Sequence, residues 1–162
     1  MLDVIADELA RLWPSPDQLI RITVRLTVAA VLGGLVGLNR ELRGKPAGLR
    51  THMLVAVGAA LFVVASLNES MQIADVSRVV QGVAAGIGFL GAGAILKIGE
   101  ERQIRGLTTA ASIWMTAAIG VAAGLGQGGL AVVAALITWL ILGVLTAVER
   151  RISGSDEHPA ES

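Results

Sequence analysis

The chain has 162 residues, of which 54% are hydrophobic and only 16% are charged, and its mean hydropathy is +0.70. Soluble domains carry about 25% charged residues, so this composition excludes an ordinary soluble domain, and it also excludes disorder, which needs low hydrophobicity and high charge. The 13 basic and 13 acidic residues cancel, which argues against a nucleic-acid partner, and the absence of cysteine excludes a disulfide scaffold and a thiolate site. The composition therefore predicts a small, all-α integral membrane protein embedded in the lipid bilayer.

The N-terminal segment, residues 1–16, is predicted to be an amphipathic helix at the membrane interface. Leu2, Ile5, Leu9 and Leu12 follow helical spacing, with charged residues between them. Trp13 precedes a proline, a pair typical of an interfacial anchor followed by a helix stop.

Residues 17–150 are predicted to form a bundle of about five transmembrane helices. The charged residues fall in clusters, and the gaps between them approach the roughly 20 apolar residues that a spanning helix needs. The alternation typical of barrel strands is missing, which favours helices. The predicted spans are residues 19–38, 51–68, 77–97, 107–125 and 130–149, and residues 151–162 form a polar tail.

Lysine and arginine residues predict the orientation of the bundle. Nine of the 13 basic residues would lie on one side, in two loops and the tail. Because basic loops stay in the cytoplasm, we expect an outside N-terminus and a cytoplasmic C-terminus.

Two predicted hairpins carry a weak internal similarity. The sequence Gly-Leu-Arg-Thr opens the second span at residues 48–51, and Gly-Leu-Thr-Thr opens the fourth at residues 106–109. A parallel two-hairpin repeat plus one helix would explain this similarity, and so would chance resemblance between helices rich in glycine, alanine and leucine.

Glycine residues concentrate on helix faces, above all in the third predicted span. Small residues four apart let the backbones of membrane helices approach closely, although a broken helix lining an ion site would also use them. We expect self-association into a homo-oligomer through the pair Gly33 and Gly37 or the pair Gly82 and Gly86. The predicted packing glycines are Gly33, Gly37, Gly82, Gly86, Gly88, Gly91, Gly93, Gly120 and Gly124.

Polar residues at the outer ends of the first and third spans form the candidate functional cluster: Arg25, Asp75, Arg78 and Gln81. Ionisable groups within a span usually face the bundle interior. The simpler interpretation is that Asp75 caps its helix and pairs locally with Arg78, while the Arg25 side chain extends to the interface. One carboxylate between two arginines is unsuited to a bare Mg²⁺ ion, so we predict neither a metal site nor a bound cofactor.

Motifs of the common hydrolases, metalloproteases and nucleotide-binding enzymes are missing from the chain. We therefore expect no catalytic residues and no enzymatic activity. His52 close to Glu41 is the only support for an intramembrane enzyme.

Three ordered motifs between about residues 20 and 148 resemble the signatures of the MgtC/SapB family of membrane proteins. The first runs from Gly37 to His52 and includes Arg40, Glu41, Arg50 and Thr51. The second runs from Asp75 to Gly93, and the third, from Gly106 to Gly120, includes Thr108, Thr109 and Trp114.

The resemblance implies about five spans in the bacterial inner membrane. It also implies a role in adaptation to magnesium limitation and, in pathogens, in survival inside host cells. Family members are thought to act through membrane-protein partners, including the ATP synthase. Two features depart from the family pattern: Asn39 stands where the family usually has Glu, and we expect no cytoplasmic C-terminal α/β domain after the polar tail.

The main hypothesis is thus a non-enzymatic membrane protein that acts through partners under magnesium limitation. The alternative is a small ion or solute transporter or channel that uses the polar cluster at Arg25, Asp75, Arg78 and Gln81.

Overall fold

The computed structural model describes residues 1, 4–5, 13–67, 73–98 and 103–145. Most of the predicted interfacial helix, the predicted tail at residues 151–162 and the end of the fifth predicted span lie outside these residues.

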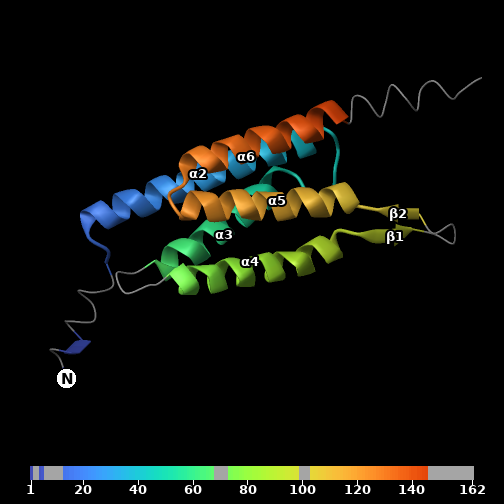
Figure 1. Cartoon of the computed structure of the whole chain (residues 1–162). Helices are drawn as coiled ribbons and strands as arrows, with labels where there is room; N and C mark the ends of the chain where they lie inside the picture. Colours follow the sequence, from blue (N-terminus) through green and yellow to red (C-terminus); the bar gives the residue numbers. More distant parts are fainter. Residues whose placement is uncertain (2–3, 6–12, 68–72, 99–102, 146–162) are drawn as a thin grey trace, which may run out of the picture.

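The described part of the chain folds into five helices, so the predicted all-α bundle is confirmed (Figure 1). The helices are α2 (Pro16–Glu41), α3 (Leu49–Ser66), α4 (Ile73–Gly93), α5 (Leu107–Gly124) and α6 (Gly128–Leu140), which continues into a π-helical turn, η1 (Ile141–Leu145). A short antiparallel hairpin, β1 (Leu96–Ile98) and β2 (Gln103–Arg105), connects α4 to α5. The sequence patterns did not predict this hairpin.

Four of the helices, α2 to α5, are long and apolar enough to cross a membrane. The apolar stretch Gly128–Val144, which covers α6 and most of η1, is shorter. At 1.5 Å per residue its 17 residues span about 25 Å, slightly less than the roughly 30 Å of a bilayer core.

Two helix starts show how local sequence fixes the elements. Ser15 and Gln18 form a reciprocal capping box at the start of α2, where Pro16 occupies the first turn. Gly106 precedes α5 with φ of 96°, a left-handed conformation that glycine adopts without steric cost. A Cβ atom at this position would also overlap the carbonyl oxygen of Ala94.

Two helices, α3 and α5, lie at the centre of the bundle, where the contact of α3 with α5 is exceeded only by that of α3 with α2. Helix α2 packs on both of them, α6 packs on α2 and α5, and α4 packs on α5 and only lightly on α3. The core consists mainly of small side chains, among them Ala29, Ala56, Ala60, Ala131 and Ala135, which are fully buried. Small residues of this kind allow the close helix contacts that membrane bundles need.

The bundle has two ends, which Figure 1 separates clearly. The loop end holds residues 42–48 and the β-hairpin, and the turn end holds the start of α2 and the connection from α5 to α6. Helices α3 and α5 lie at the centre, with α2 and α4 outside them, in the order that a two-hairpin repeat would give. The packing is nevertheless unequal, because α2 contacts both central helices closely and α4 does not. The repeat therefore stays a prediction.

Candidate functional site

A buried polar network at the loop end joins α2, α3 and α5. Arg40, in the last turn of α2, is only 2% exposed, and its Nη2 donates a hydrogen bond of 2.7 Å to Thr109 Oγ1 in the first turn of α5. A hydrogen bond from a charged donor is stronger than a neutral one. This bond therefore ties the end of α2 to the start of α5.

His52 is the second member of the network and is completely buried. Its Nδ1 lies 2.9 Å from the carbonyl oxygen of Gly48, and its Nε2 lies 3.2 Å from Ser112 Oγ. The Ser112 hydroxyl also donates to the carbonyl oxygen of Thr109 at 2.8 Å. His52 therefore connects α3 to the same turn of α5 that accepts the Arg40 hydrogen bond.

The hydrogen bonds of His52 allow two proton arrangements. Because a carbonyl oxygen can only accept, Nδ1 must carry a proton. In a neutral imidazole, Nε2 is then an acceptor, and the single proton of Ser112 can go either to Nε2 or to the carbonyl of Thr109. In a charged imidazolium, Nε2 donates to Ser112 Oγ, and both hydrogen bonds of Ser112 form at once. In the neutral network, rotation of the Ser112 hydroxyl alone exchanges these two acceptors.

Two buried polar atoms beside the network make no hydrogen bond within the described residues. They are Arg40 Nε and Asn39 Oδ1. Glu41 does not pair with Arg40, because its Oε2 accepts from the backbone N–H of Leu49 at 2.7 Å. Buried polar groups are normally satisfied, and exceptions concentrate at functional positions. We therefore take the residues around Arg40 as the candidate functional site.

The loop end carries a further contact between the 42–48 loop and the end of α6. Arg43 Nη2 donates to the carbonyl oxygen of Gly143, inside η1, at 3.4 Å. A π-helical turn disturbs the regular backbone pattern and is frequent at functional sites. Arg50 and Thr51, which belong to the same sequence motif, are exposed at the start of α3.

The predicted cluster of Arg25, Asp75, Arg78 and Gln81 is divided in the structure. Arg25 donates from Nη1 to the carbonyl oxygen of Gly124 at 2.9 Å. Its cation thus stabilises the C-terminus of α5, where carbonyl groups lack helical partners. Arg78 pairs with Asp75 on its own helix at 3.3 Å, with 78% and 42% of the two side chains exposed, and Gln81 is exposed.

The helices that carry these residues are not neighbours, because α2 packs on α3, α5 and α6, whereas α4 packs on α5 and α3. Arg25 and the Asp75–Arg78 pair are therefore two separate arrangements, and the structure does not assemble one polar site from them. The local pairing of Asp75 with Arg78 agrees with the simpler of the two sequence interpretations.

The predicted packing glycines fall into two groups. A Cβ atom at Gly33, Gly37 or Gly124 would lie within 3 Å of α3, and one at Gly120 would overlap the carbonyl oxygen of Ala56. These four glycines are used within the bundle, so Gly33 and Gly37 do not form a free surface for self-association. At Gly82, Gly86, Gly88 and Gly93 a Cβ atom would meet nothing within 4 Å, and at Gly91 it would make ordinary contact with Ala110.

The third motif contributes both buried and exposed residues. Thr109, Ser112 and Thr116 are buried on one face of α5, while Thr108 is exposed and Trp114 is 50% exposed. Thr116 Oγ1 donates to the carbonyl oxygen of Ser112 at 2.8 Å. Sequence reasoning missed Ser112 and Thr116. Ser112 lies three residues after Thr109 and Thr116 lies four residues after Ser112, which was a usable signal for one helix face. Among the described residues, no three of the types His, Asp and Glu come together as metal ligands do.

The fold and this site define a class: a helical membrane protein with several spans, in which a buried polar network joins three helices at one end. The chain belongs to the MgtC family, whose model matches residues 26–151. No solved structure matches the chain.

Relatives of known name agree with this assignment. The chain is 43% identical over 140 residues to Protein SrpB of Synechococcus elongatus, covering 80% of this chain and 77% of that one. It is 40% identical over 142 residues to a protein of Escherichia coli K12 named putative magnesium transporter YhiD, covering 83% and 65%. It is 42% identical over 130 residues to Protein MgtC of Salmonella typhimurium, covering 80% and 54%. The match thus spans about half of MgtC and less than two thirds of YhiD.

Proposed function

We propose that this protein acts without catalysis in adaptation to magnesium limitation, by binding other proteins of the bacterial inner membrane. The observation that carries the proposal is family membership over residues 26–151, together with 42% identity to MgtC. The ATP synthase is the partner that the family resemblance implies, and survival inside host cells is the further role where the bacterium that carries the protein is a pathogen.

The site at Arg40 supports a role in binding better than a role in chemistry. Its one hydroxyl next to a base among the described residues is that of Ser112, 3.2 Å from His52 Nε2, and these side chains are only 2% and 0% exposed. An acyl- or phosphoryl-transfer enzyme needs a nucleophile that its substrate can reach. The network links three helices through a few hydrogen bonds. A partner that shifts the end of one of these helices would therefore also shift the ends of the other two. We therefore assign the network the role of coupling the loop end to the bundle.

The proposed orientation places the loop end in the cytoplasm. Arg40, Arg43, Lys45, Arg50 and Arg105 all lie at or next to this end, and short cytoplasmic loops are enriched in such residues. The N-terminus is then outside. We also propose that the protein forms a homo-oligomer in the membrane.

Growth of a deletion strain in limiting and in replete magnesium tests the proposal. Slower growth in limiting magnesium only, restored by the full chain, is the expected result. Equal growth of deletion and parent strains in both media would contradict the link to magnesium. Co-purification from native membranes with the full chain as bait would then identify the partner.

The second candidate function is transport of an ion or small solute. It is favoured by the name of the E. coli relative, putative magnesium transporter YhiD. The divided positions of Arg25 and the Asp75–Arg78 pair weaken the proposed transport site. Flux of Mg²⁺ into liposomes that hold the purified chain would establish this alternative, and no flux with or without a membrane potential would dismiss it.

A further inference from the structure

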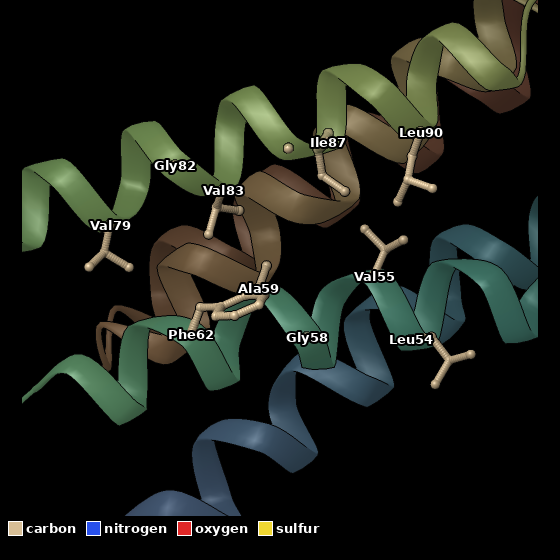
Figure 2. Close-up of a pocket in the computed structure, with 11 residues that line it drawn as sticks. Leu54, Val55, Gly58, Ala59, Phe62, Val79, Gly82, Val83, Ile87 and Leu90 are labelled. Atoms are coloured by element: carbon tan, nitrogen blue, oxygen red, sulfur yellow. The ribbon is translucent and has the colours of Figure 1, made fainter.

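An apolar groove of about 630 Å³ runs between α3 and α4 (Figure 2). Its walls are formed by Val79, Val83, Ile87 and Leu90 of α4 and by Leu54 and Phe62 of α3. In Figure 2 the four α4 side chains point toward α3 across the groove. None of the apolar window of α4 is buried inside the protein, so in a membrane this groove opens to the lipid.

Glycine residues keep the groove open. Gly58 on α3 and Gly82 and Gly86 on α4 line it, and a Cβ atom at any of them would meet nothing within 4 Å. The hollow therefore results both from the missing side chains and from the light packing of α4 on α3.

The length of the groove corresponds to one leaflet of a bilayer. From Val79 to Leu90 the rise along α4 is about 16 Å, close to half of the roughly 30 Å hydrocarbon core. A helix segment of the same length, about 10–12 Å across, occupies roughly 1,300–1,900 Å³. This is more than the groove can enclose, so a helix could only pack over its open side, whereas a hydrocarbon chain can lie inside it.

A basic residue stands at the loop end of the groove. Arg50 lies one helical turn before Leu54 on the same face of α3, and it is exposed. Within the described residues its side chain makes no hydrogen bond or ion pair. It also lies in the first turn of α3, where the helix dipole is positive and where Glu41 Oε2 accepts from the N–H of Leu49, the first of the free helix N–H groups. This end of the groove is therefore complementary to an anionic headgroup.

We propose that the groove between α3 and α4 binds an acyl chain of an anionic phospholipid whose phosphate contacts Arg50. The apolar walls hold the chain over one leaflet depth, and the arginine selects a negatively charged headgroup at the loop end. Protein contacts with such lipids combine apolar burial with attraction between basic residues and phosphates.

Photocrosslinking tests this site in the full chain. The protein is reconstituted in phosphatidylethanolamine vesicles with phosphatidylglycerol that carries a diazirine halfway along one acyl chain, and the labelled peptides are mapped. We expect labelling between Leu54 and Phe62 and between Val79 and Leu90. The double substitution G82L and G86L fills the groove, so the labelling is lost.

Two controls make the result specific. The double substitution G88L and G93L adds the same side chains to the same helix, at positions that are equally open but do not line the groove, and labelling should persist. The variant Arg50→Gln should lower the preference for the phosphatidylglycerol probe over a phosphatidylethanolamine probe about five-fold, as expected for one basic residue near a charged headgroup.

Three results would overturn the proposal. One is labelling spread evenly over α4 and unchanged by G82L and G86L. Another is equal labelling of the wild type by the two probes. The third is a groove occupied by a second copy of the chain. In that case Val83→Cys, in a chain that otherwise has no cysteine, would form disulfide-linked dimers, and lipid labelling of the groove would be missing. That outcome would assign the groove to a second copy of the chain.

Discussion

Replacing Thr109 with valine should destabilise the bundle because the buried guanidinium of Arg40 loses its hydrogen-bond acceptor. The hydroxyl of Thr109 accepts the 2.7 Å hydrogen bond from Arg40 Nη2, and Arg40 Nε already makes no hydrogen bond within the described residues. Valine has nearly the same shape as threonine, so the main change is loss of the acceptor.

The magnitude follows from the charge and the burial. A hydrogen bond to a charged group contributes about 1.5–3 kcal/mol, and a buried donor left without its acceptor loses its solvation as well. We expect Thr109→Val to lower the free energy of unfolding by about 2–3 kcal/mol. Arg40→Met, which removes the charge itself, should cost less, about 1 kcal/mol. The double variant should be close to Arg40→Met alone, which gives a coupling energy of about 2 kcal/mol.

Equilibrium unfolding of the purified chain in mixed micelles, followed by circular dichroism, measures these free energies. Thr138→Val is the matched control. Thr138 is also buried, but its hydroxyl donates only to Ala134 on its own helix, so its loss should cost about 0.5 kcal/mol. A coupling energy below about 0.5 kcal/mol between Thr109 and Arg40, or equal losses for the two threonine variants, would refute the reasoning.

Four other substitutions test the packing of the bundle by the same measurement. Gly120→Ala should lower the free energy of unfolding by about 3 kcal/mol because the new methyl group meets the backbone of α3. Gly88→Ala, in open space, should raise it by up to about 1 kcal/mol through helix propensity. Similar effects of the two substitutions would contradict the assigned contact between α5 and α3. Gly106→Ala should cost more than about 2 kcal/mol, since it combines a left-handed φ with a clash, and a wild-type unfolding curve would show that the turn before α5 is wrongly described. Arg25→Met should cost about 1–2 kcal/mol by leaving the C-terminus of α5 without its donor, and no loss would mean that Arg25 is simply solvated at the interface.

Hydropathy predicted the number of helices because the bilayer imposes a length on each apolar run. The same reasoning could not predict which neighbour each helix would choose. Gly33 and Gly37 have the same spacing as Gly82 and Gly86, yet only the first pair is packed against another helix of the chain. Spacing shows that two small residues share a face, and it carries no information on what covers that face.

The polar residues show a similar limit. The predicted cluster placed Arg25 with the carboxylate of Asp75, but Arg25 donates to the backbone carbonyl of Gly124. Every residue has a backbone carbonyl, so the sequence does not indicate which one will accept a hydrogen bond. The motif residues Arg40, His52 and Thr109 were recognised from the family resemblance, whereas their contacts depend on how α2, α3 and α5 cross. The β-hairpin was missed because its strands are only three residues long, too short to show alternation.

The central claim is that the network around Arg40 is needed for the role of this protein under magnesium limitation. Complementation of a deletion strain in limiting magnesium, with the amount of each variant in the membrane matched, tests it most directly. We predict that the wild-type chain and Thr138→Val restore growth and that Thr109→Val does not. Growth restored by Thr109→Val to the wild-type level would contradict it.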